Sequence, residues 1–334
     1  MSTDVSVVIP TYRRPAPLRD AIQSALAQQG VSMEVIVVDD DPDGSAEAVV
    51  RSVGDPRVQF LRCEPATGGN PAIVRNLGWP KAIGRYVHFL DDDDIIVPGA
   101  HREMVAALDA APEKGMVFGV IEPFGDDSAA LQKERAYFAG AAHRARIAHR
   151  FGSRRLRMAF MLFHNTMLVN SACMIRRTCI GPLGGYRPAV LVVEDVDFYS
   201  RAMRRFGSVF LNRPVIRYRC GAPSIMSGQK NNAVIARSYA KMYDAYRSEY
   251  GALEFNALQL LARLVLRVLF VLTVSSGLID EPEPDTRPTE DVATYSAAAT
   301  SRDASHRPAS SRGVQLFRFK PLHGQASEGV LLSD

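Results

Sequence analysis

Short apolar runs alternate with helical patterns over the first ninety residues of this 334-residue chain. The runs are nearly unbroken stretches of valine, isoleucine and leucine, as in parallel strands that are buried on both faces. Alternation of this kind is typical of an open α/β sheet, which binds ligands beyond the carboxyl ends of its strands. The predicted strands are 5–10, 34–38, 58–62 and 85–90, and the predicted helices are 18–28, 44–53 and 72–83.

The remainder of the chain is less regular. Short strands are predicted at 208–211 and 215–219, and one clear helix at 195–206. Residues 1–230 therefore read as one α/β domain and 231–279 as C-terminal helices. Residues 280–334 are rich in Pro, Ser, Thr and Arg, a composition that predicts a disordered tail.

Composition excludes several classes of protein. The net charge of +4 is small for this length, so we expect no nucleic acid as a partner. The four cysteines show no zinc-site spacing and fit free thiols in a reducing compartment. The first residues carry no basic start and no long apolar run, so we expect a cytoplasmic protein. No GxGxxG follows the first strand, which argues against a dinucleotide-binding dehydrogenase.

Acidic runs follow two of the predicted strands. Asp39-Asp40-Asp41 ends the second strand, and Asp91-Asp92-Asp93-Asp94 ends the fourth. Adjacent carboxylates repel one another unless a cation lies among them, and Mg²⁺ takes one or two carboxylates together with substrate phosphates. The alternative is a pair of solvated acidic turns, which are common. Two such runs after two buried strands favour a site for a metal and a nucleotide.

A second acidic pair, Glu194-Asp195, begins the helix predicted at 195–206. Carboxylates at a helix N-terminus are stabilised by free backbone N–H groups and by the helix dipole. Helix capping alone would account for the pair. The functional interpretation makes one of the two a general base.

Together, these residues resemble the inverting glycosyltransferase family 2, which has the GT-A fold, over about residues 4–225. The resemblance implies an open, mostly parallel, Rossmann-like sheet flanked by helices. It places a nucleotide-binding half at about 1–115 and an acceptor-binding half at about 116–230. The matching segments, in the family's order, are 5–13, 37–40, 75–78, 89–94 and 184–186, followed by Glu194-Asp195 and Arg201.

The resemblance also implies roles for single residues. The base of the nucleotide would be bonded by Asp39 or Asp40, and its ribose by Asp92. The metal, Mn²⁺ or Mg²⁺, would be held by Asp93 with Asp91, and Asp195 would be the general base. The nucleoside pocket would be lined by Pro10, Thr11, Tyr12 and Arg13, Arg75 would approach the base or the diphosphate, and Glu194 and Arg219 would support the acceptor or the leaving group.

Two departures from the family pattern are visible. Asp41-Pro42-Asp43 stands where many relatives carry Gly-Ser, and no His follows Tyr218-Arg219, where many relatives complete the metal or diphosphate site. Arg219, Lys230 or the basic stretch at 143–157 could hold the diphosphate instead.

The predicted function is transfer of a sugar from a nucleoside-diphosphate donor, UDP-linked on family grounds, to a saccharide or lipid-linked acceptor in bacterial polysaccharide or glycolipid synthesis. A non-catalytic nucleotide-sugar-binding or scaffold protein on this fold is the alternative. A sugar nucleotidyltransferase is disfavoured because no Gly-rich phosphate loop follows the first strand.

Two segments predict peripheral membrane contact at the inner face of the cell membrane. One is the basic stretch at 143–157, which could also be a solvated helical face. The other is 253–279, an apolar segment with one narrow polar stripe formed by Asn256, Gln259, Arg263 and Arg267. Its uncharged part, 268–279, is too short to cross a bilayer, which needs about 20 apolar residues, and the two arginines in mid-segment also argue against spanning. We therefore expect a helix that lies in the membrane interface or, alternatively, one that packs against the catalytic domain or a partner subunit.

Overall fold

The structure is a computed structural model that describes residues 3–151, 153–164, 168–221 and 232–275. Residues 1–280 form one compact unit. The expected disordered tail at 280–334 lies outside the described residues. The domain boundary at residue 230 stays a prediction.

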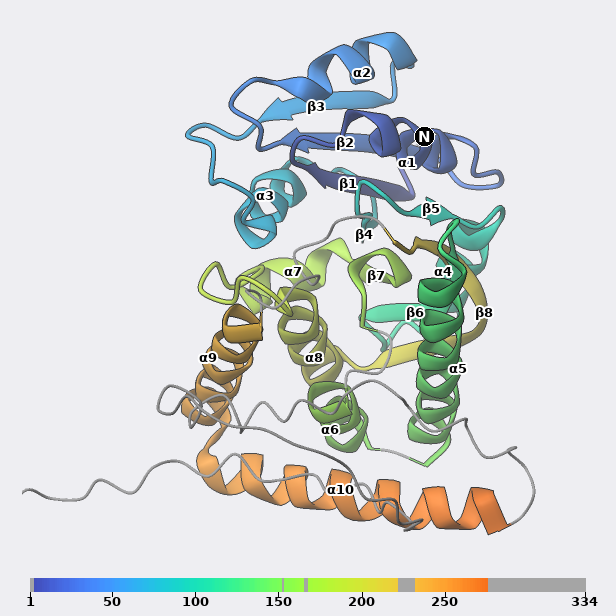
Figure 1. Ribbon diagram of the computed structural model, residues 1–334, viewed down its shortest axis with the longest axis vertical. Helices are drawn as coiled ribbons and strands as arrows, with labels where there is room; N and C mark the ends of the chain where they lie inside the picture. The colour runs from blue at the N-terminus through green and yellow to red at the C-terminus, as the bar shows by residue number, and fades with distance from the viewer. Residues whose placement is uncertain (1–2, 152, 165–167, 222–231, 276–334) are drawn as a thin grey trace, which may run out of the picture. The chain divides into compact units, whose positions relative to one another are not determined.

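Eight strands form one mixed sheet in the order β3-β2-β1-β4-β7-β6-β8-β5. Strands β1 to β4 pair in parallel with one another, whereas β7 runs antiparallel to both β4 and β6. Figure 1 shows helix α10 crossing the end of the unit opposite α2. The strands are β1 (Val5–Thr11), β2 (Met33–Asp39), β3 (Val58–Arg62), β4 (Tyr86–Phe89), β5 (Ile95–Ile96), β6 (Met116–Phe124), β7 (Cys173–Arg176) and β8 (Ser208–Arg219).

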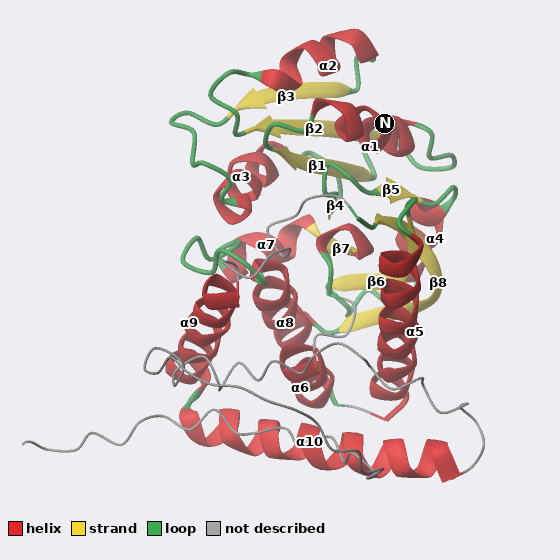
Figure 2. Cartoon of the chain, viewed as in Figure 1, coloured by secondary structure: helices red, strands yellow, loops and turns green. Residues whose placement is uncertain are grey.

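Helices flank both halves of the sheet (Figure 2). Helices α1 to α4 are the connections of the N-terminal half, and α5 to α10 belong to the C-terminal half. The helices are α1 (Pro15–Leu26), α2 (Ser45–Val53), α3 (Pro71–Gly78), α4 (Ala100–Asp109), α5 (Ser128–Phe151), α6 (Arg154–His164), α7 (Arg177–Leu183), α8 (Glu194–Phe206), α9 (Asn232–Tyr250) and α10 (Ala252–Ser275), with short 3₁₀ turns η1 (Trp79–Lys81) and η2 (Asn170–Ala172).

The predicted α/β sheet is confirmed, with two corrections. The expected helix at 72–83 ends at Gly78 and continues only as a 3₁₀ turn, because Pro80 cannot continue the backbone hydrogen bonding. The two strands expected at 208–211 and 215–219 are one strand, β8, whose pairing with β6 shifts register around Val120. Such a bulge bends a strand without ending it.

Close packing fixes α3 and the turn before α8. A Cβ added to Gly78 would lie 2.6 Å from Val8 Cγ1, so only glycine lets α3 approach the sheet this closely. Gly185 has a φ of +69°, and a Cβ there would lie 2.4 Å from Asn76 Oδ1. Asn76 also donates to the carbonyl oxygen of Tyr186 at 2.8 Å. These contacts join α3 to the segment that leads into α8.

An aromatic cluster then ties α8 to the centre of the sheet. The Tyr186 ring stacks on Phe198 with 4.2 Å between centroids, and Phe89 of β4 meets Tyr186 edge-on at 5.0 Å. Each such pair contributes about 0.5–1.5 kcal/mol beyond its buried area. Arg201 and Asp197, which form a buried ion pair one helical turn apart, add to this anchor. The start of α8 is therefore held against the carboxyl end of β4.

Candidate active site

Asp39 and Asp40, in the acidic run after β2, hold two loops in place at the carboxyl edge of the sheet. Asp39 accepts backbone N–H bonds from Asp41 and Ala46, both at 3.0 Å. Asp40 accepts from the N–H and the hydroxyl of Thr67, each at 2.6 Å. Both acids are at most 1% exposed. Their predicted contact with the base of a nucleotide is untested.

The loop after β1 lies against these acids. Pro10 and Thr11 are buried in β1, Tyr12 is half-buried, and Arg13 is exposed. Arg13 has a φ of +58°, a strained conformation for a residue with a side chain. Its guanidinium bonds Asp41 and lies 5.3 Å from the Tyr12 ring centroid. The residues expected to line a nucleoside pocket are thus neighbours in space, although no nucleotide defines that pocket.

The four acids after β4 contact different parts of the chain. Asp91 accepts from Arg75 Nη2 at 2.6 Å, and Asp92 accepts from the Thr11 hydroxyl at 2.7 Å. Asp94 accepts from the backbone N–H of Arg219 at 3.1 Å. Asp92 is 5% exposed and Asp94 only 1%. The alternative of a solvated acidic turn is therefore wrong for this run.

Arg14 is a site residue that the sequence did not identify. Its Nη1 lies 2.6 Å from Asp93 Oδ2 and 3.3 Å from Asp92 Oδ1. The guanidinium therefore neutralises part of the charge that makes four adjacent acids unfavourable. The sequence offered one signal for this role, because Arg14 is a basic residue directly after the segment 5–13 that matches the family.

Burial sets the protonation of these carboxyl groups. Burial, followed by the charge of Asp93, raises the pKa of Asp92 to about 7. Burial and the charge of Asp91 raise the pKa of Asp93, and burial places the pKa of Asp94 well above its ordinary value. A further positive charge among them would reverse these shifts.

Glu194 and Asp195 begin α8, as predicted, but helix capping is not the main contact of Glu194. The residue before them, Val193, has a φ of +63°, which is rare for a β-branched residue and typical of strain held at functional sites. Glu194 is buried and accepts from Arg75 Nη1 at 2.7 Å. Asp195 is half-buried and accepts only a local N–H bond, from Val196 at 2.7 Å, among the bonds identified for it. Burial, and then the charge of Glu194, raise the pKa of Asp195 well above its ordinary value.

Arg75 joins the two acidic groups. It is 3% exposed, and its two terminal nitrogens bond Asp91 after β4 and Glu194 on α8. Its guanidinium also lies 5.5 Å from the ring centroid of Tyr186. One buried cation thus brings together carboxylates that are more than one hundred residues apart in the sequence. A contact of Arg75 with the base or the diphosphate stays a prediction.

Asn170 and Ser171 lie beside this bridge and support it. Tyr186 donates its hydroxyl proton to Asn170 Oδ1 at 2.6 Å, and the amide of Asn170 lies 3.5 Å from Glu194. Ser171 Oγ accepts the backbone N–H of Asp91 at 3.0 Å. Asn170 and Ser171 lie in the irregular region, where no periodicity or motif marks them in the sequence.

The chemistry of the Asp91–Asp94 turn suits a hard divalent cation. Asp94 Oδ2 is buried without a hydrogen-bond partner in the described part of the chain. The described residues contain no group of three His, Cys, Asp or Glu arranged as a metal site. Mg²⁺ commonly uses one or two carboxylates and completes its shell with phosphate and water. Asp91 and Asp93 accept from Arg75 and Arg14, and their role as ligands of a cation that arrives with a diphosphate stays a prediction.

Arg219 lies at the same turn. Its Nε donates to the backbone carbonyl of Asp93 at 2.9 Å, and its Nη2 lies 3.1 Å from Asp20. This position agrees with the expected contact to a leaving diphosphate, which is untested. Lys230, the other candidate, lies outside the described residues.

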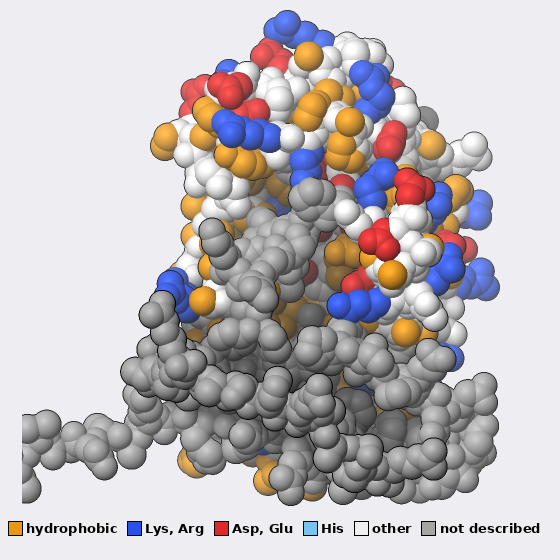
Figure 3. Space-filling view, in the orientation of Figure 1, with side chains coloured by type: hydrophobic (Ala, Val, Ile, Leu, Met, Phe, Trp, Pro, Cys, Tyr) orange, Lys and Arg blue, Asp and Glu red, His pale blue; other side chains and the backbone are white. Residues whose placement is uncertain are grey.

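The described surface shown in Figure 3 mixes acidic and basic side chains.

The fold resembles solved glycosyltransferase structures. TarS residues 1–349 from S. aureus, crystallised with UDP, aligns with a TM-score of 0.51 at 16% identity and covers 72% of this chain and 65% of that one. At this identity the match concerns the fold alone. It confirms the predicted GT-A class.

Sequence relatives point to one family. The succinoglycan biosynthesis protein ExoO of Rhizobium meliloti is 40% identical over 108 residues, which are 32% of this chain and 30% of that protein. An uncharacterized Mycobacterium tuberculosis protein is 30% identical over 62% of this chain and 64% of its own length. A Campylobacter jejuni GalNAc(5)-diNAcBac-PP-undecaprenol beta-1,3-glucosyltransferase is 35% identical over 29% of this chain and 31% of that protein. This chain thus aligns with less than two thirds of each relative's length. The model of glycosyl transferase family 2 matches residues 6–181, which is more than half of the chain, and the chain therefore belongs to this family.

Proposed function

We propose that this protein transfers a sugar from a nucleoside-diphosphate donor, UDP-linked, to a saccharide or lipid-linked acceptor, with inversion at the anomeric carbon. The observation that carries the proposal is the Arg75 bridge between Asp91 and Glu194. This bridge joins the acidic turn after β4 to the acidic pair that begins α8, which supports a shared site in which one group of carboxylates holds the donor's metal and the other supplies the general base.

The relatives support the class of substrate. ExoO is named for succinoglycan biosynthesis, and the Campylobacter enzyme is named for a diphosphate-undecaprenol acceptor. TarS was crystallised with UDP. A bacterial polysaccharide or glycolipid is therefore the product that we propose, with a UDP-sugar as donor.

The residues divide the chemistry as follows. Asp195 removes the proton of the acceptor hydroxyl as this oxygen attacks the anomeric carbon from the face opposite the diphosphate. Burial raises the pKa of Asp195 well above its ordinary value, which makes its carboxylate a stronger base than an exposed aspartate. Glu194, held by Arg75, fixes the start of α8 and so the direction of Asp195. Arg219 neutralises charge on the leaving diphosphate.

A divalent cation held by Asp91 and Asp93, Mn²⁺ or Mg²⁺, would stabilise the negative charge of that leaving group. Asp92 would bond the ribose, and Asp39 or Asp40 the base. Thr11, Tyr12 and Arg13 would surround the nucleoside.

The test compares Asp195→Asn with the wild-type protein. We expect sugar transfer, and hydrolysis of the UDP-sugar without acceptor, to disappear, while UDP and Mn²⁺ still raise the melting temperature as in the wild type. Asp244→Asn, an exposed acid on α9, is the matched control. Equal loss of donor binding and transfer would remove Asp195 from the role of base. Wild-type protein that binds UDP-sugars or GDP-sugars without turning them over would instead support the non-catalytic alternative.

A further inference from the structure

Over residues 252–264, where its side chains are described, helix α10 packs on the unit with one of its faces. Phe255, Leu258 and Ala262 are buried, and the helix contacts α6 and α9. Phe255 meets Phe163 of α6 and Tyr243 of α9 with ring centroids 5.2 and 5.3 Å apart. The packed-helix alternative for this segment is thus correct for one face of the helix.

The opposite face of α10 is a row of exposed leucines. Leu260 follows Leu253 by seven residues and Leu264 follows Leu260 by four, which puts these three on one side of the helix, away from Phe255 and Ala262, with Leu261 at the border of that side. Of the seven large apolar side chains that are conspicuously exposed in the described residues, four belong to this row. The row comprises Leu253 (88% exposed), Leu260 (59%), Leu261 (42%) and Leu264 (50%).

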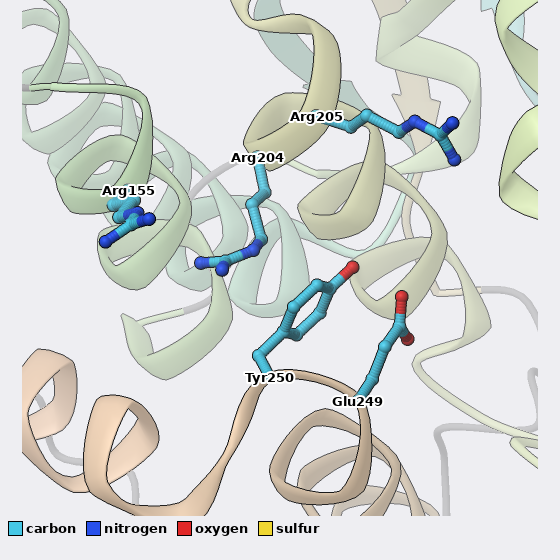
Figure 4. A pocket seen from close by; sticks show the side chains of 5 residues that line it. All are labelled: Arg155, Arg204, Arg205, Glu249 and Tyr250. Atoms are coloured by element: carbon cyan, nitrogen blue, oxygen red, sulfur yellow. The ribbon is translucent and has the colours of Figure 1, made fainter.

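An arginine pocket adjoins this leucine row. A cavity of about 350 Å³ is lined by Arg155 of α6, Arg204 and Arg205 of α8, and Glu249 and Tyr250 at the end of α9 (Figure 4). Glu254 of α10, the chain neighbour of Leu253, pairs with Arg204 of the pocket, so the pocket lies beside the start of α10.

The pocket carries excess positive charge. Arg204 and Arg155 both approach Glu254, Arg155 only at 3.9 Å, so two cations share one carboxylate. Arg205 donates to the carbonyl oxygen of Pro182, which does not cancel its charge. Glu249 is itself paired with Arg187.

The geometry of the pocket suits an anionic group. Arg204 is held in place by the Tyr250 ring, whose centroid lies 4.0 Å from the guanidinium carbon. Arg155 is 66% exposed, so its guanidinium can reach an anion that arrives from solvent. Arginine is well suited to phosphate because its N–H groups form a planar fork.

We propose that the leucine row and the arginine pocket form one docking surface for an anionic phospholipid bilayer. The leucines enter the boundary between the headgroups and the acyl chains. Arg155 and Arg204 bind a lipid phosphate in the headgroup layer. This surface assigns a face and a ligand chemistry to the membrane contact predicted from the sequence. It does not depend on the proposed transfer reaction.

A second copy of this chain suits the surface less well. A second copy would cover the leucines, but it would supply no anion for the arginine pocket at the start of α10. An anionic bilayer supplies both the apolar layer and the opposite charge. No helix in the described part of the chain has the length and hydrophobicity to span a bilayer, so the proposed contact is peripheral.

The test is co-sedimentation of the full chain with vesicles of phosphatidylglycerol mixed with an equal amount of phosphatidylcholine. We expect binding that falls when phosphatidylglycerol is left out and when salt is raised. Leu260→Ser with Leu264→Ser should weaken binding by about a hundredfold, and Arg155→Glu by about tenfold. Melting temperatures near that of the wild type would show that the variants are folded.

Two matched controls lie away from the surface. Ile83→Ser removes an apolar side chain that is 65% exposed, and Arg213→Glu reverses an arginine that is 72% exposed and has one long ion pair. Both should bind vesicles as the wild type does. Equal binding by the α10 variants and the controls would overturn the proposal. So would a dimer in light scattering that the leucine variant dissolves while no vesicles are bound, or stabilisation by inorganic phosphate without vesicle binding.

Discussion

Replacing Arg75 with methionine tests the bridge on which the candidate site depends. Methionine has a similar volume and no charge, so Asp91 and Glu194 would lose their common partner while the packing against Tyr186 is largely kept. We expect the variant to fold with a clearly lower free energy of unfolding. The cause is a buried carboxylate left without a cation.

The magnitude follows from how deeply each carboxylate is buried. Removing one partner of a buried ion pair costs about 3–5 kcal/mol. The side chain of Glu194 is 10% exposed and takes nearly this full cost, whereas Asp91 is 29% exposed and recovers part of it from water. We therefore expect a loss of about 3–4 kcal/mol. In a unit of this size, that loss lowers the melting temperature by roughly 6–12 °C.

The assay is thermal and urea unfolding at pH 5 and at pH 8. Burial raises the pKa of Glu194 and Arg75 opposes that shift, so its removal raises the pKa further. When the pKa of a carboxyl group is higher in the folded than in the unfolded protein, the free energy of unfolding falls as the pH rises above the unfolded pKa. The deficit should therefore be larger at pH 8 than at pH 5.

A double-mutant cycle isolates the bridge. Adding Glu194→Gln to Arg75→Met should restore about 1.5–3 kcal/mol, because the unpaired charge is then gone. Arg176 is the matched control, since it donates to backbone carbonyl groups and its replacement by methionine should not couple to Glu194→Gln. A cost below about 1 kcal/mol for Arg75→Met, or no recovery in the double variant, would refute the reasoning.

Three further predictions concern single features of the site. Gly185→Ala should cost about 2–4 kcal/mol because its Cβ would lie 2.4 Å from Asn76, whereas Gly184→Ala, also at positive φ but with nothing within 4 Å, should cost only about 1–2 kcal/mol in urea unfolding. The kcat/KM of sugar transfer should rise with pH along a limb whose midpoint lies well above the ordinary aspartate pKa, since Asp195 must be ionised to act; a rate independent of pH between 4 and 8 would contradict this. Arg14→Gln should enlarge the rise in melting temperature that Mg²⁺ alone produces, because Asp93 loses its competing cation; an unchanged rise would mean that Arg14 does not compete with the metal.

The N-terminal half of the fold could be predicted closely from the sequence. Strands β1 and β2 are nearly unbroken apolar runs with every residue buried, and burial on both faces of a parallel sheet produces that pattern directly, whereas β3 lies at the edge of the sheet and is only partly buried. β8 was harder, because its centre contains Asn212, Arg213 and Pro214, which read as a turn. Pairing with β6 and a bulge keep it one strand, and neither is visible from a single segment.

The candidate site was predictable where its residues follow strands. Asp91, Asp92 and Asp93 lie after β4, and Glu194 and Asp195 begin α8, as expected. The contacts that organise them were not predictable. Arg75 lies inside α3, and its partners come from two other parts of the chain. Asn170 and Tyr186 also act through contacts across the fold, which depend on how α8 packs against β4.

Four adjacent acids can occupy the turn after β4 because four different helices and strands of the fold contact it. Asp91 faces α3 through Arg75, Asp92 faces β1 through Thr11, Asp93 faces the start of α1 through Arg14, and Asp94 faces the end of β8. Each carboxylate therefore has a separate partner, and a single turn fastens four elements at the carboxyl edge. Arg14 and Arg75 also neutralise part of the negative charge of this turn. If Asp91 and Asp93 hold a metal, as we propose, it must compete with Arg14 and Arg75 for these carboxylates, and the strength of the two ion pairs would then limit how tightly it binds.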